Sequence, residues 1–185
     1  RLEIAAAAAQ DKNFHVRELF EPFLPDSQRA KTLGPTPNTA KLLALKASPV
    51  KGGILFRQAG RTLCVNCHRV QGEGKNIGPD LSQIGARLNR EQLLESLLAP
   101  SATIPDGFIL YTLEMKSGDA HSGFLLERGK DTAQFRLITG EEKTLPTQGV
   151  KRFTEVPTSI MPAGLLQNLT PQEAADLLAY LASLR

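Results

Sequence analysis

Residues 64 to 68 of the chain read Cys64-Val65-Asn66-Cys67-His68. This stretch contains both cysteines of the chain and one of its three histidines. Two thiols at this spacing can each add to a vinyl group of haem and form a thioether. The histidine that follows then lies beneath the iron, where an imidazole nitrogen can bind it. The motif therefore predicts covalent attachment of one c-type haem, with His68 as the proximal iron ligand.

Two other kinds of site also use closely spaced cysteines. A thioredoxin-like disulfide needs a strand before the motif and a βαβ unit around it, whereas this sequence has a glycine-bearing helix before and a Gly/Asn/Pro loop after. A structural zinc ion needs four ligands. No second pair of cysteines exists, and His15 and His121 stand apart from the motif. The flanking sequence therefore favours haem.

Composition sets the broad class of the protein. The 185 residues suffice for one domain with an appendage, or for two small domains. Apolar residues make up 41% and charged residues 22%, which is typical of soluble globular proteins. The net charge of +3 is mildly basic, but no Lys/Arg run points to nucleic acid. No apolar run reaches membrane-spanning length. The composition leaves the oligomeric state open.

The N-terminus bears on the compartment. The chain begins at Arg1, and the run Ala5–Ala9 is short enough to be the remnant of a processed or fused N-terminus. Haem attachment to such motifs normally takes place outside the cytoplasmic membrane. We therefore expect a bacterial protein of the periplasm or another extracytoplasmic compartment, with a removed signal or an upstream domain.

Apolar periodicity and capping residues predict a set of helices. Ser48-Pro49 and Thr170-Pro171 each combine an N-cap hydroxyl with proline at the first helical position. Gly52 and Gly53 inside one of these helices indicate the close approach of another, for which the last helix is the candidate. The predicted helices cover residues 11–24, 39–47, 48–58, 89–98 and the segment that follows Thr170.

From about Phe108 the apolar period changes to that of strands. Short alternating segments separated by tight turns predict a small antiparallel barrel, SH3-like or Sm-like, or a curled sheet with Met115 in its core. Because helical segments flank this block, we interpret it as an insertion. The predicted strands are 108–115, 120–127, 132–138, 142–145 and 150–155.

A loop before the last helix offers a second iron ligand. Met161 is one of two methionines and lies in Ser159-Ile160-Met161-Pro162-Ala163-Gly164-Leu165. A thioether is a soft ligand for haem iron, and a Met/His pair raises the reduction potential. The alternative is a gap-filling core methionine, the commonest role of this residue. We predict Met161 as the distal ligand, ahead of His121 near a solvent-facing edge and His15 on a surface helix.

The order of these features resembles the class I c-type cytochromes. It is more specifically similar to the Planctomycete/Verrucomicrobium type of haem-binding domain, over about residues 48–185. The long gap between His68 and Met161 departs from ordinary class I members, although that type carries such an insertion, and Ala163 replaces an often acidic residue. The matching stretches are Gly52–Phe56, Cys64–Val70, Gly78–Leu81, Pro100-Ser101, Ser159–Leu165 and Asp176–Leu181.

The resemblance implies a mainly α class I cytochrome c fold with an inserted small antiparallel β-barrel or sheet, α+β overall. The carbonyl of Pro79 would accept a hydrogen bond from His68 Nδ1, and Arg87 is a candidate partner of a haem propionate. The implied segments are an N-terminal helical extension (1–47), two parts of the cytochrome core (48–107 and 157–185) and the β subdomain (108–156).

The resemblance implies a one-electron carrier rather than an enzyme. Two strong axial ligands would leave the iron no open position for a substrate. The implied partners are redox proteins, such as a dehydrogenase or a terminal oxidase. One alternative is a haem peroxidase or gas sensor in which Met161 is labile. Another is the electron-accepting haem module of a larger dehydrogenase, onto which the strand block docks.

Overall fold

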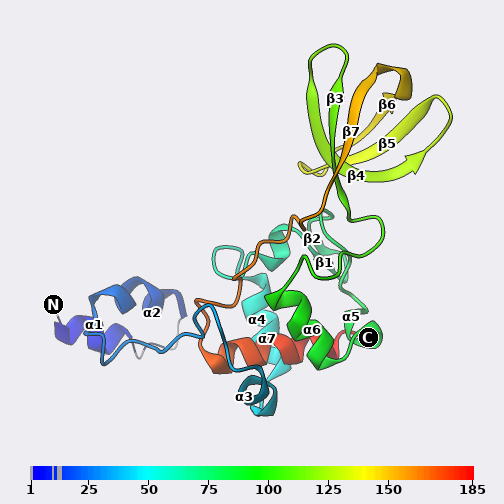
Figure 1. The fold of residues 1–185 in the computed structure, drawn as a ribbon. Coiled ribbons are helices and arrows are strands. Elements are labelled where there is room, and N and C mark those ends of the chain that lie inside the picture. The colour runs from blue at the N-terminus through cyan, green and yellow to red at the C-terminus, as the bar shows by residue number, and fades with distance from the viewer. Residues whose placement is uncertain (1, 10, 12–13) are drawn as a thin grey trace.

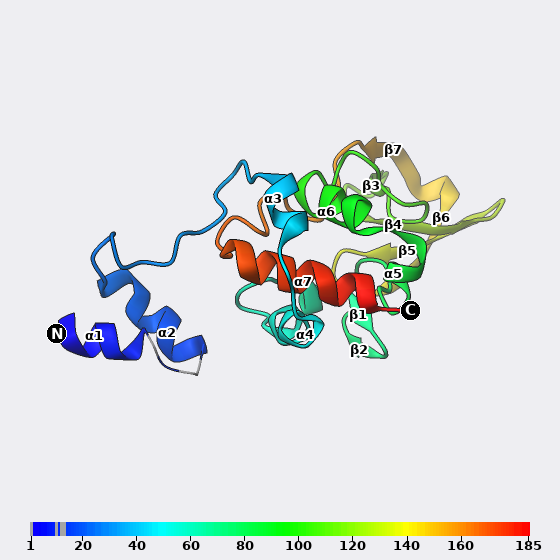
Figure 2. The same ribbon diagram turned by 90° about the horizontal axis from the view of Figure 1, so that it is seen from below.

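The computed structural model describes residues 2–9, 11 and 14–185. A helical body carries a projecting sheet and a helical N-terminal segment that extends away from the body in both views (Figures 1 and 2). The N-terminal segment contains α1 (Leu2–Ala8), α2 (Phe14–Phe20) and the 3-10 helix η1 (Glu21–Phe23). The body contains α3 (Thr39–Ala44), α4 (Pro49–Arg57), the 3-10 turn η2 (Cys64–Asn66), the hairpin of β1 (Arg69–Val70) and β2 (Glu73–Gly74), α5 (Ile84–Arg87), α6 (Arg90–Leu98) and α7 (Pro171–Ser183).

Helix α4 crosses α7 in the most extensive helix contact of the body (Figure 2). A Cβ atom on Gly52 would collide with the carbonyl group of Asp176 and lie 2.7 Å from the Cβ atom of Tyr180. The rings of Phe56 and Tyr180 meet beside this point, with their centroids 5.5 Å apart. The crossed helix pair that the glycines predicted is therefore confirmed.

A buried carboxylate joins the beginning of α4 to α7. Asp176 is 3% exposed. Its Oδ1 accepts hydrogen bonds from the backbone N–H of Ser48 at 2.7 Å and from Nε2 of Gln172 at 2.9 Å. A carboxylate loses hydration when it is buried and needs such donors in return. These hydrogen bonds thus compensate the lost hydration of Asp176, and the bond from Ser48 fixes where α4 begins.

Side-chain caps begin three helices of the body. Asn89 and Gln92 form a reciprocal capping box at the beginning of α6, and Thr170 and Glu173 form another at α7. Ser48 caps α4 by accepting a hydrogen bond from the backbone of Lys51. These local contacts place the apolar faces of the helices towards one core.

The helical core collects side chains from the whole body. It includes Leu42 of α3, so the segment before α4 packs on the body. The segment just before α3 also lies alongside it, because the backbone N–H groups of Leu33 and Gly34 donate to the carbonyl oxygens of Leu169 and Gln167 at 2.8 and 3.1 Å. The other buried members are Phe56, Val70, Ile84, Leu93, Leu94, Leu97, Leu166, Leu169, Ala174, Leu177, Leu178, Leu181 and Leu184.

The five predicted strands are confirmed as one antiparallel sheet that projects from the body (Figure 1). Their order is β6-β5-β4-β3-β7. The 3-10 turn η3 (Thr147–Gly149) carries the chain from one edge strand to the other, and β7 pairs with β3 instead of β6. The sheet therefore stays open: of the two predicted alternatives, the antiparallel sheet is found and the closed barrel is not. The strands are β3 (Leu110–Met115), β4 (Ala120–Arg128), β5 (Thr132–Leu137), β6 (Glu142–Pro146) and β7 (Val150–Val156).

The sheet has an apolar core of its own. Leu113, Ala133, Phe135 and Leu145 are buried there, and Met115 packs against them as predicted. Two cores thus stabilise the two halves of the molecule separately. The sheet leaves the body and returns to it at neighbouring points, because Leu110 at the start of β3 is paired with Val156 at the end of β7.

The helix crossing yields a stability prediction. We expect Gly52→Ala to lower the free energy of unfolding by about 1–3 kcal/mol, because an added methyl group must push two packed backbones apart. Gly60→Ala is the matched control, since a Cβ there meets no atom within 4 Å. Urea denaturation of both variants measures the difference. Equal midpoints would show that α4 and α7 need no glycine at their contact.

Candidate haem-attachment site

The Cys64–His68 motif forms a single tight turn. The 3-10 helix η2 (Cys64–Asn66) begins after Leu63, whose backbone is left-handed with a φ of 59°. The backbone N–H groups of Cys67 and His68 both donate to the carbonyl oxygen of Cys64, at 3.1 and 2.8 Å. Hydrogen bonding within the motif thus holds both thiols and the imidazole close together, and each of the three side chains is half-buried.

The orientation of His68 is set by the Gly-Pro loop. Its Nδ1 lies 2.8 Å from the carbonyl oxygen of Pro79, the contact that the resemblance implied. A carbonyl can only accept, so Nδ1 carries the proton and Nε2 keeps a lone pair in the neutral ring. Burial lowers the pKa of His68, and the bond to Pro79 offsets this only in part. The site therefore favours a neutral imidazole with Nε2 able to bind a metal.

Glycines allow two loops to approach the motif. A Cβ atom on Gly78 would lie 2.6 Å from Cε1 of His68, so only glycine lets the loop pack on the imidazole ring. The backbone N–H of Gly78 donates to the carbonyl oxygen of Cys67 at 2.8 Å. On the other side, Gly74 has a φ of 99°, and a side chain there would meet the carbonyl group of His68. The motif is thus held between the Gly-Pro loop and the β1–β2 hairpin.

The environment of Cys64 disfavours disulfide chemistry. Burial raises the pKa of its thiol, and Sγ lies 3.4 Å from the carbonyl oxygen of Thr62. Disulfide exchange needs a thiolate, which a raised pKa makes scarce. Both cysteines are free thiols in the structure. Helix α4 precedes the motif and a two-stranded hairpin follows it, so the βαβ unit of a thioredoxin-like site is absent from the described residues.

Met161 lies in the loop between β7 and α7. Its side chain is half-buried against the helical core, the same core against which Cys64, Val65 and Leu81 pack. Its backbone N–H donates to Oγ of Ser159 at 3.1 Å. Met161 follows Cys67 by 94 positions in the sequence (161 minus 67). The structure nevertheless packs the predicted distal ligand and the cysteine motif against the same apolar cluster.

Arg87 is the last residue of α5, and its exposed side chain donates from Nη2 to the carbonyl oxygen of Asp80 at 3.1 Å. Hydrogen bonds from Ser82 lower the pKa of the Asp80 carboxyl, and the charges of Arg69 and Arg87 act in the same direction. This arrangement shows how Arg87 supports the loop that carries Pro79. The Arg87 side chain contacts this loop at a backbone carbonyl group, that of Asp80.

Two further arginines were missed by the sequence reasoning. Arg69 Nε is buried without a hydrogen-bond partner, and so are Nε and Nη2 of Arg90. The only sequence signal was that Arg69 directly follows His68. Buried N–H groups need acceptors, which the carboxylates of haem could supply. The free thiols, the open Nε2 of His68, the thioether of Met161 and these guanidinium groups together make a donor set that fits a covalently held haem.

The other candidate ligands lie elsewhere. His121 is half-buried at the beginning of β4, opposite Leu113. Its strand is central to the sheet, so the predicted edge position is wrong; pairing of β4 with both β3 and β5 places it there. His15 falls within α2, and its side chain lies outside the described part of the structure. Among the described residues, no group of three or more His, Cys, Asp or Glu side chains could hold a metal ion.

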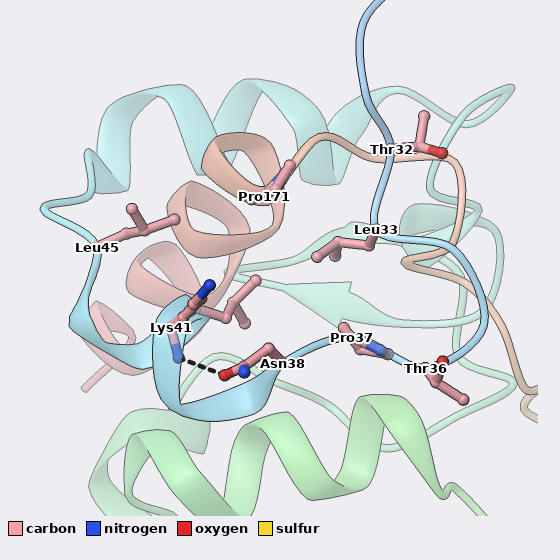
Figure 3. A pocket seen from close by; sticks show the side chains of 9 residues that line it. Thr32, Leu33, Thr36, Pro37, Asn38, Lys41, Leu45 and Pro171 are labelled. Atoms are coloured by element: carbon pink, nitrogen blue, oxygen red, sulfur yellow. Dashed lines mark hydrogen bonds between the residues drawn. The ribbon is translucent and has the colours of Figure 1, made fainter.

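A separate pocket lies between the segment before α4 and the beginning of α7 (Figure 3). Leu33, Leu42 and Pro171 contribute apolar walls, and Asn38 accepts a hydrogen bond from the backbone of Lys41 at its rim. None of the predicted site residues lines this pocket.

Part of the body and the first strands of the sheet resemble a known protein family. Residues 51–121 match the family model named Cytochrome c. This stretch runs from α4 into β4 and includes Cys64, Cys67, His68, Pro79 and Arg87. No curated protein matches the chain. No helix in the described ranges has the length and apolar character of a membrane span. This match supports a haem-binding c-type cytochrome with covalently bound haem c, its iron and redox partner proteins.

Proposed function

We propose that this protein is a class I cytochrome with one haem, and that it carries single electrons between redox partners with His68 and Met161 as axial ligands. The observation that carries the proposal is the Cys64–His68 turn, in which the bond from His68 Nδ1 to Pro79 leaves Nε2 free. Haem, when bound, supplies a one-electron couple at its iron. The chain's residues decide how that couple is used.

The proposed roles of the chain follow from its packing. His68 offers a neutral nitrogen whose ring cannot rotate without breaking its bond to Pro79. Met161 offers a soft sulfur from the edge of the apolar core. With both positions filled by protein, no substrate would reach the iron, and an uncharged sulfur ligand in an apolar site would raise the reduction potential. Half-buried Cys64 and Cys67 mark the edge where electrons enter and leave.

Arginines would provide the anchors for the propionates. Arg87 remains our proposed partner from the sequence, and its exposed side chain lies beside the loop that carries Pro79. The buried unpartnered N–H groups of Arg69 and Arg90 make these two residues additional donors. The side chains proposed to wall the haem are all buried: Leu55, Phe56, Leu93, Leu97 and Leu177.

The wider assignment is also a proposal. Sequence similarity to the Planctomycete/Verrucomicrobium type makes the sheet an insertion (108–156) between two parts of the cytochrome core (48–107 and 157–185), with residues 1–47 as an extension. The electron partners would be a dehydrogenase or a terminal oxidase. An extracytoplasmic location follows from where haem is normally attached to such motifs.

The optical spectrum tests the proposed function directly. We expect one haem per chain by mass and iron analysis, sharp low-spin bands and a weak far-red sulfur-to-iron band in the oxidised protein. Carbon monoxide should not shift the reduced spectrum, because both axial positions are filled. A high-spin spectrum or ready CO binding would instead support the peroxidase or gas-sensor alternative.

Replacing the sulfur ligand tests the axial pair. Met161→Ala should abolish the far-red band, lower the reduction potential and let CO bind the reduced protein, because the iron loses a soft ligand. Met115→Ala is the matched control, since Met115 packs in the core of the sheet. Potentiometric titration of both variants measures the effect. An unchanged potential in Met161→Ala would contradict its assignment as a ligand.

Removing the sheet tests whether the body forms the haem site alone. Replacement of residues 108–155 by a short glycine linker should leave the low-spin spectrum and reduction by ascorbate unchanged, because the sheet and the body have separate cores. If the sheet docks the electron partner, the same variant should be reduced more slowly by that protein. Loss of the far-red band on deletion would show that the sheet helps to hold Met161.

A further inference from the structure

We propose that Ser101 is a positioning residue for Met161 and that it acts through Ser159. Ser101 lies in the turn that follows α6, before the chain enters the sheet. Ser159 lies three residues after the end of β7, where the chain returns. This inference rests on the proposed function, because it assigns the support of the proposed distal ligand.

The first contact joins the segment that leads into the sheet to the segment that returns from it. The backbone N–H of Ser159 donates to Oγ of Ser101 at 3.1 Å, across 58 positions of sequence. All five strands of the sheet lie between these two residues. The bond therefore fastens the returning chain to the turn after α6. Helix α6 itself is anchored, because its leucines belong to the helical core.

The second contact links Ser159 to Met161. The hydroxyl oxygen of Ser159 accepts a hydrogen bond from the backbone N–H of Met161 at 3.1 Å. This is the local serine turn in which a hydroxyl binds the backbone two residues on. Ser159 thus donates with its backbone and accepts with its side chain, so that Ser101, Ser159 and Met161 form one chain of hydrogen bonds.

The loop needs such a support because the core holds it on one side only. The side chain of Met161 packs against the helical core, whereas Ile160 is 38% exposed and Pro162 is exposed. Apolar contact is non-directional and cannot by itself aim a sulfur atom. Hydrogen bonds to the backbone on either side of Ile160 can fix that direction.

The size of the effect follows from the exposure of the contact. Ser101 is exposed, so water competes for the bond. A neutral hydrogen bond typically changes an equilibrium by about 2- to 10-fold. Loss of the Ser101 hydroxyl should therefore increase by that factor the population in which Met161 has left the iron, without removing His68 or the thioether bonds.

The experiment compares Ser101→Ala, Ser101→Thr and Ser96→Ala in the haem-loaded full chain. Ser96 is the matched control, because its hydroxyl donates within α6 to the carbonyl oxygen of Gln92. The readouts are the far-red band of the oxidised protein and the rate of CO binding to the reduced protein. We expect Ser101→Ala to weaken the band and to bind CO about 2- to 10-fold faster. Ser101→Thr keeps the hydroxyl and should resemble the parent protein, as should Ser96→Ala.

Three results would overturn the inference. The first is a Ser101→Ala protein that matches the parent in both readouts, while Met161→Ala opens the iron; the axial pair then stands and only the support fails. The second is an equal effect of Ser101→Ala and Ser101→Thr, which would show that the hydroxyl is not responsible. The third is a parent protein without the far-red band, which would refute the proposed function as well.

Discussion

The close crossing of α4 and α7 at Gly52 organises the helical body. Helix α4 leads into the cysteine turn, and α7 follows the loop that carries Met161. The position of one helix against the other therefore helps to set the distance between the two proposed ligands, His68 and Met161. An ion pair reinforces the same junction, because Arg61 binds Glu173 at 2.7 Å while Glu173 also caps α7. With side chains 11% and 22% exposed, this pair is less screened by solvent than a surface ion pair.

The proposed site depends both on contacts within the cysteine motif and on contacts between residues that are far apart in sequence. The turn that presents the thiols and His68 is closed by hydrogen bonds within the motif. The protonation of the ring is decided from outside, because the carbonyl of Pro79 requires a proton on Nδ1 and burial disfavours the charged form. Met161 depends on contacts still farther apart in sequence. Its side chain rests on the helical core, and its backbone is bound to Ser159, which in turn is bound to the turn after α6.

Much of the fold could be predicted because its signals are local. Serine, threonine and asparagine caps placed the beginnings of α4, α6 and α7, and alternation of apolar residues located all five strands of the sheet. The short elements were missed. The strands of the β1–β2 hairpin have two residues each, and α5 has four, too few for any period to appear. Closure of the sheet could not be decided either, since it depends on whether β7 pairs with β3 or β6.

The amino-acid sequence is enough to place two thiols and an imidazole in one short segment, because five consecutive residues cannot be far apart. It also determined Met161 as a candidate, because a lone methionine beside Pro162 and Gly164 suits an ordered loop. The packing of the helices was needed to see that N–H groups of Arg69 and Arg90 are buried without a partner, whereas Arg87 is exposed. Burial and hydrogen bonding across long separations depend on how the helices pack, and no local pattern of residues encodes that packing.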